Sequence, residues 1–156
     1  MFIFLAWKRD KILTALMKAI PDTEHAVVLR TDFSDQKGWE EICAEIRKPV
    51  GIFRFRANVD FMDQVEYANS TKEQILELTL PHYSHSFIIV ADRIAISEAG
   101  HPLLVLELFD RGGLEFRAIP SKVQAIENNL SIANIDFEEF VEAVGPDGVF
   151  RGFPGE

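Results

Sequence analysis

Two short apolar segments place the tightest limits on how this chain folds, Ala26–Arg30 (AVVLR) and Phe87–Ala91 (FIIVA). Neither segment alternates polar with apolar residues, so each is predicted to be a strand that is buried on both faces. Asp32 lies just beyond the first segment, and Asp92 directly follows the second. Strands of this kind are typical of a sheet with helices packed on it.

The strongest helix prediction follows the first strand. Trp39, Ile42, Cys43 and Ile46 recur at i, i+3, i+4 and i+7, which is the spacing of one helix face. The candidates for the N-cap of this helix are Thr31, Asp32 and Ser34.

Capping signals and prolines outline the other helices. The run Ser70-Thr71-Lys72-Glu73 matches a capping box and opens a helix that Pro81 stops. Pro120-Ser121 begins another helix, and Asp136 caps the last one. The apolar spacing also predicts a short amphipathic helix over residues 10–20.

A further strand is predicted over residues 52–61, where aromatic and aliphatic side chains alternate with polar ones. Arg54 and Arg56 fall on the polar face of this strand. Two arginines so placed can bind a carboxylate or a phosphate group. We prefer a structural interpretation, in which they pair across the sheet with Glu107 or Glu115.

The predicted fold is therefore a single α/β (α+β mixed) domain with a mixed sheet of about five strands. Residues 103–109 and 114–119 are expected to form an antiparallel C-terminal hairpin around two glycines. We expect the globular domain to span residues 21–156 and residues 1–20 to be an N-terminal extension. Translation from Met17 instead of Met1 would remove most of that extension.

The net charge of the chain indicates which classes of partner are favoured. The chain has 16 Lys and Arg against 25 Asp and Glu, a formal net charge of −9. Such a surface repels nucleic-acid phosphates and anionic lipid heads and attracts a basic protein. Cys43 is the only cysteine, which excludes an intrachain disulfide and fits a reducing cytoplasm. No apolar segment is long enough for a membrane-spanning helix, and a signal peptide is not predicted.

Common catalytic signatures are missing, because the chain has no Gly-rich phosphate loop, HExxH, GxSxG or paired-cysteine motif. If the chain is an enzyme, its candidate catalytic residues are Asp32, Asp92 and His85. Two carboxylates beyond the carboxyl ends of strands can hold a divalent metal. The structural interpretation is preferred: the aspartates cap a helix or form a turn, while His85, like His82 and His101, is hydrogen-bonded. No cofactor and no metal are expected.

The acidic residues gather near the C-terminus, since no Lys or Arg lies between Lys122 and Arg151. Acids favour helix N-termini, and charged surfaces often serve only solubility. A patch of one sign can also steer a partner of the opposite sign. The candidate binding residues are Asp136, Glu138, Glu139, Glu142 and Asp147.

Several motifs share a family resemblance. They are LRTDFSD at 29–35 with Trp39, Tyr83 and His85, HPLL at 101–104, ENNLSIAN at 127–134, DFEEF at 136–140 and DGVFRGF at 147–153. Over about residues 20–153 the chain resembles a family of uncharacterised bacterial domains of unknown function. The resemblance implies no activity, substrate or cofactor.

The sequence leaves three functional hypotheses. The first is a non-enzymatic acidic protein-binding domain, for instance an immunity-type protein that neutralises a basic toxin. The second is a small metal-dependent or hydrolytic enzyme that uses Asp32, Asp92 and His85. The third is a structural subunit of a larger assembly. We favour the first because the charge is one-sided and no catalytic motif is complete.

Overall fold

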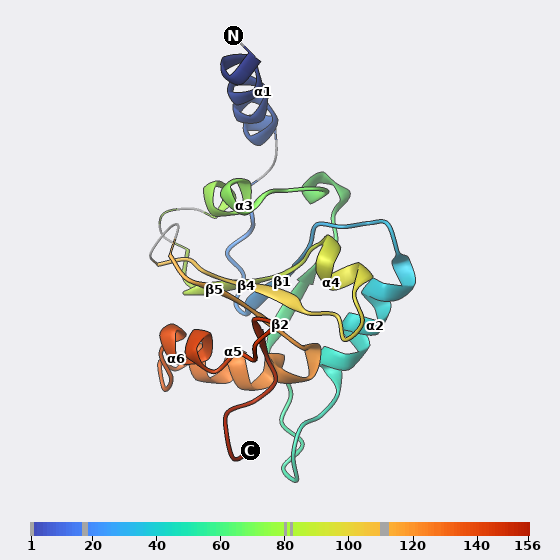
Figure 1. Cartoon of the computed structure of the whole chain (residues 1–156), viewed down its shortest axis with the longest axis vertical. Helices are drawn as coiled ribbons and strands as arrows, with labels where there is room; N and C mark the ends of the chain where they lie inside the picture. Colours follow the sequence, from blue (N-terminus) through green and yellow to red (C-terminus); the bar gives the residue numbers. More distant parts are fainter. Residues whose placement is uncertain (1, 17–18, 80, 82, 110–112) are drawn as a thin grey trace.

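The computed structural model describes residues 2–16, 19–79, 81, 83–109 and 113–156. Its centre is one six-stranded sheet in the order β2-β1-β3-β4-β5-β6. The strands are β1 (Ala26–Arg30), β2 (Val59–Met62), β3 (Phe87–Ala91), β4 (Leu103–Glu107), β5 (Glu115–Ala118) and β6 (Val149–Phe150). The α-helices are α1 (Phe2–Leu16), α2 (Gln36–Arg47), α3 (Lys72–Leu78), α4 (Arg93–Ser97), α5 (Val123–Ser131) and α6 (Phe137–Glu142). Figure 1 shows α3 on one face of the sheet and α5 and α6 on the other.

The strand directions confirm a mixed α/β sheet, with six strands instead of about five. β1 runs parallel to β2 and β3, whereas β3, β4 and β5 are antiparallel in turn. The predicted C-terminal hairpin is present, because Leu103 faces Ala118 and Leu106 faces Glu115. Part of its turn, residues 110–112, lies outside the described residues. The additional strand β6 pairs in parallel with β5 and, with two residues, is too short for a periodic pattern.

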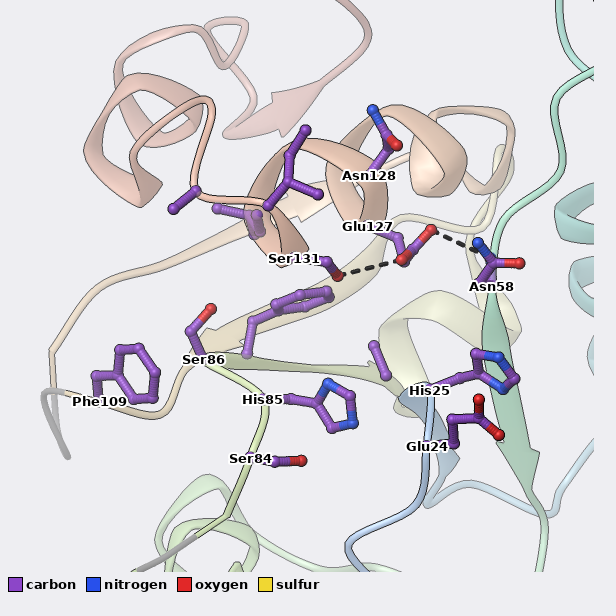
Figure 2. A pocket seen from close by; sticks show the side chains of 15 residues that line it. Glu24, His25, Asn58, Ser84, His85, Ser86, Phe109, Glu127, Asn128 and Ser131 are labelled. Atoms are coloured by element: carbon purple, nitrogen blue, oxygen red, sulfur yellow. Dashed lines mark hydrogen bonds between the residues drawn. The ribbon is translucent and has the colours of Figure 1, made fainter.

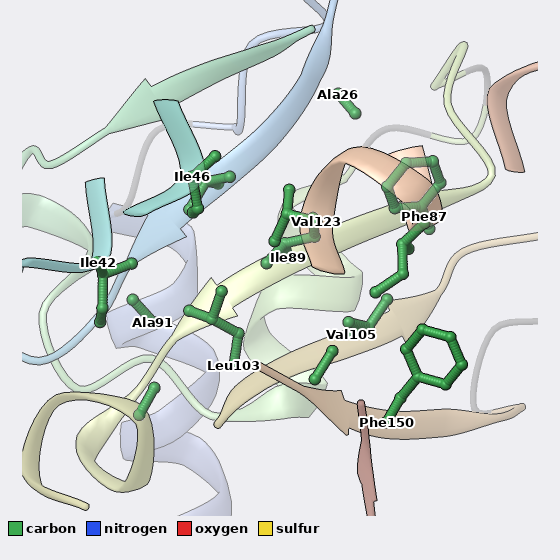
Figure 3. Close-up of a cluster of buried hydrophobic side chains, with 14 of the residues drawn as sticks. Ala26, Ile42, Ile46, Phe87, Ile89, Ala91, Leu103, Val105, Val123 and Phe150 are labelled. Atoms are coloured by element: carbon green, nitrogen blue, oxygen red, sulfur yellow. The ribbon is translucent and has the colours of Figure 1, made fainter. Parts of the chain in front are cut away.

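The two apolar strands are buried on both faces, as predicted, and every residue of β1 and β3 is buried. On one face Val28 and Ile89 pack in a cluster with apolar residues of α2, α5 and α6. Figure 3 shows Ile89 of this cluster with Ile42 of α2 and Val123 of α5. On the other face Val27 and Ile88 pack in a second cluster that includes α3. Helices on both faces therefore exclude water from the centre of the sheet.

Aromatic rings attach the C-terminal elements to the sheet. Phe140 of α6 stacks on Phe116 of β5 with ring centroids 5.6 Å apart. The Phe140 ring also lies 5.1 Å from the Phe150 ring and 5.2 Å from the Phe153 ring. Phe140 and Phe150 are fully buried, so this cluster belongs to the core on the α5 and α6 side.

The strand predicted over residues 52–61 is wrong in its first half, because β2 begins only at Val59. Instead, Val50 and Phe55 exchange backbone hydrogen bonds of 2.7 and 2.9 Å across a tight turn. Phe53 at this turn is 75% exposed. Alternation indicates a strand only if the apolar face meets a core, and this segment lies beyond the sheet.

The predicted pairing of Arg54 and Arg56 with sheet carboxylates is also wrong. Arg54 sits in the turn with φ +56, and Arg56 donates a 2.8 Å hydrogen bond to the Arg47 carbonyl. Glu115 instead pairs with Lys72 at 3.4 Å, and Glu107 accepts a hydrogen bond from the Leu114 backbone. Arg54 and Arg56 cannot pair with carboxylates on neighbouring strands because their segment is not part of the sheet.

The helix predicted over residues 10–20 is placed differently in the structure. α1 runs from Phe2 to Leu16, and Met17 lies outside the described residues. Ile20 is fully buried in the core, and its backbone N–H donates a 2.9 Å hydrogen bond to the Leu78 carbonyl. The apolar character of Ile20 thus reflects packing beside α3 rather than a helix face.

The helix caps lie within a few residues of their predicted positions. The α3 capping box uses Thr71 and Gln74, one residue later than the Ser70 pattern. The N-cap of α2 is Asp35, so the prediction of Thr31, Asp32 or Ser34 was wrong. Asp136 caps α6 as predicted, in a capping box with Glu139. None of the helices within the described ranges combines the length and apolarity needed to cross a bilayer.

Candidate functional site

A cavity of about 710 Å³ opens where β1 and β3 begin, against the end of α5 (Figure 2). It is built from segments far apart in the sequence, which the parallel pairing of β1 with β2 and β3 brings together. The lining residues used below are Glu24, His25, Asn58, His85, Phe109, Glu127 and Ser131. Its volume falls within the range of small-ligand sites.

Glu127 of α5 is the buried charge of this cavity, since only 6% of the residue is exposed. Its Oε2 accepts a 3.1 Å hydrogen bond from the Asn58 backbone N–H, and its Oε1 accepts one of 3.1 Å from the Ser131 hydroxyl (Figure 2). Both donors are neutral. Neither donor supplies a counter-charge, so a cation placed beside this carboxylate would complete a buried ion pair.

His85 contributes an imidazole whose orientation is fixed by the backbone. Its Nε2 donates a 2.8 Å hydrogen bond to the Thr23 carbonyl, because a carbonyl oxygen can only accept. When the ring is neutral, Nδ1 is therefore left as a hydrogen-bond acceptor. The preceding residue Ser84 donates two hydrogen bonds to Asp22, and the ring of Tyr83 packs against the His85 ring. These contacts fasten the segment before β3 to the segment before β1.

The second imidazole, His25, lies 3.5 Å from Asp60, measured from Nδ1 to Oδ1. Burial alone raises the pKa of Asp60, but hydrogen bonds from Thr23 and His25 outweigh it and lower this pKa below its ordinary value. Glu24 beside His25 is exposed at the mouth of the cavity. The cavity lining therefore has a second carboxylate besides Glu127, and this one is at the exposed mouth.

The charges and surfaces of the cavity favour a cationic group with an apolar stem. Its described lining includes Glu24 and Glu127 but no lysine or arginine. α5 ends at Ser131 on the same wall, and the C-terminal end of a helix dipole favours positive charge. Phe109 and Ile132 supply apolar surface beside these acids.

The three candidate catalytic residues do not converge. Asp32 and Asp92 follow β1 and β3, so they lie at the carboxyl edge of these parallel strands. His85 precedes β3 and lies at the opposite, amino end of this strand. The extended strand with its flanking residues separates His85 from Asp92 by about 20 Å. Within the described part of the chain, no three His, Cys, Asp or Glu side chains are grouped to hold a metal ion.

The two aspartates instead hold local structure. Asp32 accepts hydrogen bonds from the backbone and hydroxyl of Ser34, which makes a turn before α2. Asp92 caps α4 by accepting from the Ala95 N–H at 3.1 Å. Asp92 also forms two hydrogen bonds with the guanidinium of Arg117, at 3.0 and 2.7 Å.

The acidic C-terminal candidates are divided between structural contacts and solvent. Asp136 and Glu139 are joined in the α6 capping box. Asp147 is bonded twice by Arg151, whose hydrogen bonds lower the pKa of Asp147 to about 2. All five candidates, including Glu138 and Glu142, are exposed. Of these five acids, only Asp147 has its charge paired with a basic side chain, so most of the predicted acidic surface is present.

Two other reactive side chains are structurally occupied. His101 Nδ1 lies 2.8 Å from the Ala95 carbonyl, and its Nε2 lies 3.2 Å from Glu41. Cys43 is buried on the inner face of α2, and this burial raises the pKa of its thiol to about 11. His82 lies outside the described residues.

The two buried tyrosines of the α3-side core cluster predict an alkaline transition. Burial raises the pKa of both tyrosines in the chain, and the nearby Asp22 charge adds to the rise at Tyr83. The pKa of each tyrosine in the folded protein therefore exceeds its value in the unfolded chain, which is about 10. The protonated hydroxyls contribute to the free energy of unfolding below about pH 10, and this contribution is lost as the pH rises above that value. We expect tyrosinate absorbance to appear only together with loss of the far-ultraviolet circular dichroism signal.

Tyr83→Phe is the matched test of that transition, because it removes only the hydroxyl that donates to the Pro21 carbonyl. The variant should show a smaller loss of unfolding free energy above about pH 10. A tyrosine that titrates near pH 10 in a fully folded protein would contradict the expectation.

Sequence reasoning missed the cavity, although one signal for it was present. Val123, Ile126, Glu127 and Leu130 share the i, i+3, i+4, i+7 spacing of the inner face of α5. A glutamate in that stripe is a polar residue at a core position. Its partner Asn58, 69 residues away, has no comparable signal.

The family comparison identifies a domain without an assigned activity. The family model for DUF6924, a domain of unknown function, matches residues 25–153. The matched range includes His25, Asn58, His85 and Glu127 of the cavity. A search of curated proteins finds no match.

Proposed function

The chain belongs to DUF6924, a family of domains of unknown function, and we propose that it is a non-enzymatic protein-binding domain whose cavity receives a cationic side chain of its partner. The observation that carries the proposal is the buried Glu127 carboxylate, which faces a cavity whose described lining has no lysine or arginine. The partner class is a basic protein segment. A cytoplasmic location, as for a protein with a free buried thiol, is part of the same proposal.

Size and surface support a side chain rather than an isolated ion. The cavity of about 710 Å³ exceeds the needs of one cation, and its wall includes apolar residues such as Phe109 and Ile132. Lysine and arginine pack an aliphatic stem on apolar surface while their charged end meets an acid. The immunity-type role remains one form of this proposal, since a toxin is one kind of basic partner.

An enzyme that uses Asp32, Asp92 and His85 is not favoured by the geometry. The aspartates lie at the carboxyl ends of β1 and β3, and His85 lies at the amino end of β3. Each also has a structural partner, namely Ser34, Arg117 and the Thr23 carbonyl. General acid–base chemistry needs these groups within hydrogen-bond reach of one substrate.

Peptide titration followed by nuclear magnetic resonance tests the proposal. The probe is a capped Ala-Arg-Ala-Arg-Ala peptide, and its citrulline twin has the same shape without charge. We expect saturable shifts of the Asn58 and Ser131 amides with arginine and weaker shifts with citrulline. Glu127→Gln should weaken arginine binding about fivefold, the size of one partly screened charge contact.

Glu138→Gln is the matched control, because it removes one carboxylate from the exposed surface of α6 outside the cavity. It should leave arginine binding unchanged. Equal binding of the arginine and citrulline peptides, or shifts that avoid the cavity residues, would refute a cation-binding role.

A further inference from the structure

The turn between α2 and β2 forms an exposed apolar arm, defined here as residues 50–56. Ile52 is 90% exposed, Phe53 75% and Phe55 59%. Figure 1 shows this segment reaching away from the sheet and its helices. The Val50–Phe55 backbone pair holds the arm in shape, so its rings are presented at little further cost in conformational entropy.

The same arm is basic in a chain that is acidic overall. Arg54 and Arg56 lie within it, and Arg47 and Lys48 at its base are exposed as well. Clustered aromatic and arginine side chains are the composition of interface hot spots. An exposed apolar cluster ringed by charge marks a contact surface rather than a solubility feature.

The cavity described above is complementary to this arm in charge and in polarity. It presents Glu24 and Glu127 with the apolar surfaces of Phe109 and Ile132, and no lysine or arginine in its described lining. Arginine and phenylalanine side chains match both features. The arm does not fill the cavity of its own chain, because Ile52 and Phe53 are exposed.

Arm and cavity are also neighbours in the fold. Asn58, two residues beyond the arm, lines the cavity and donates its backbone N–H to Glu127. Two complementary surfaces side by side allow two copies to exchange arms about a two-fold axis, which closes the assembly at a dimer.

We propose that the 50–56 arm of each copy inserts into the cavity of a second copy, with Phe53 on the apolar wall and Arg54 toward Glu127. This inference rests on the proposed function, because it identifies the source of the cationic side chain as a second copy of this chain. The cavity of one copy is then completed by residues of the other.

Sedimentation velocity on the full chain tests the exchange. We expect a dimer at low salt that dissociates as salt rises, because the contact depends on opposite charges. Phe53→Ser with Arg54→Glu should raise the dimer dissociation constant by at least about tenfold, as expected for hot-spot residues. Ser131→Arg, which places a cation at the cavity wall, should do the same. Circular dichroism checks that both variants fold.

Mixing these two monomeric variants gives the sharpest result. One arm and one cavity then remain intact in each mixed pair, so a weak heterodimer should form although neither variant dimerises alone. Glu138→Arg, a charge reversal on α6, is the control and should remain dimeric. A monomeric wild type at low salt, or a dimer that all these substitutions leave intact, would overturn the exchange.

The arginine peptide separates this inference from the proposed function. The peptide is titrated into the variant with Phe53→Ser and Arg54→Glu, whose cavity is unchanged. Peptide binding without self-association rejects the exchange and retains the cation-binding cavity. Absence of peptide binding rejects the proposed function.

Discussion

Replacing Phe140 by alanine is expected to lower the free energy of unfolding by about 3–5 kcal/mol. Phe140 is fully buried, and its ring packs against Phe116, Phe150 and Phe153. The substitution removes this apolar area and leaves a space that three rings fill only by moving. Urea unfolding followed by circular dichroism measures the change.

That loss is large against the whole stability of a domain of this size, which is typically about 5–15 kcal/mol. Phe2→Ala is the matched control, because it removes the same atoms from a side chain that is 85% exposed and lies outside the cavity. Its effect should stay within about 0.5 kcal/mol. Equal effects of the two substitutions would mean that α6 and the C-terminal segment do not pack on the sheet as described.

Replacing Arg117 by methionine is expected to cost about 2–3 kcal/mol of unfolding free energy. The guanidinium donates to Asp92 at 3.0 and 2.7 Å and to the Pro102 carbonyl at 2.8 Å. The Arg117 and Asp92 side chains are only 20% and 25% exposed, so the carboxylate left behind is poorly hydrated. Partial exposure sets the cost below that of a fully buried pair. Urea unfolding again gives the value.

Arg151→Met provides the control for Arg117. Arg151 binds Asp147 with the same 3.0 and 2.7 Å distances, but both side chains are more than half exposed. Water replaces its contacts, so its loss should be much the smaller one. A double-mutant cycle between Arg117→Met and Asp92→Asn isolates the pair, because asparagine keeps an acceptor for the Ala95 N–H. Strictly additive effects would show that Arg117 and Asp92 are not coupled.

The secondary structure was predictable where the local sequence pattern of a segment is sufficient to determine its conformation. The apolar runs of β1 and β3 require burial on two faces, and the stripe Trp39 to Ile46 requires one buried helix face. The Asp136 cap satisfies backbone groups within a few residues of itself. These signals are local, so sequence alone contains them.

The errors occurred where the same pattern has two physical outcomes. Alternating Phe and Arg over 52–58 suits a strand or a projecting arm, and only the absence of sheet neighbours for this segment distinguishes them. Ile20 has the apolarity of a helix face but contributes to the core beside Leu78.

The candidate site depended on tertiary structure almost entirely. The sequence determined that His85 precedes one strand and that Asp32 and Asp92 follow two, but the parallel direction of β1 and β3 decided that they lie at opposite edges. Likewise, the sequence placed Glu127 on a helix, whereas the packing of α5 near β2 decided that it meets Asn58 in a cavity. Spacing along the chain encodes hydrogen bonds within an element. Proximity between distant segments is set by strand order and direction, which no local pattern encodes.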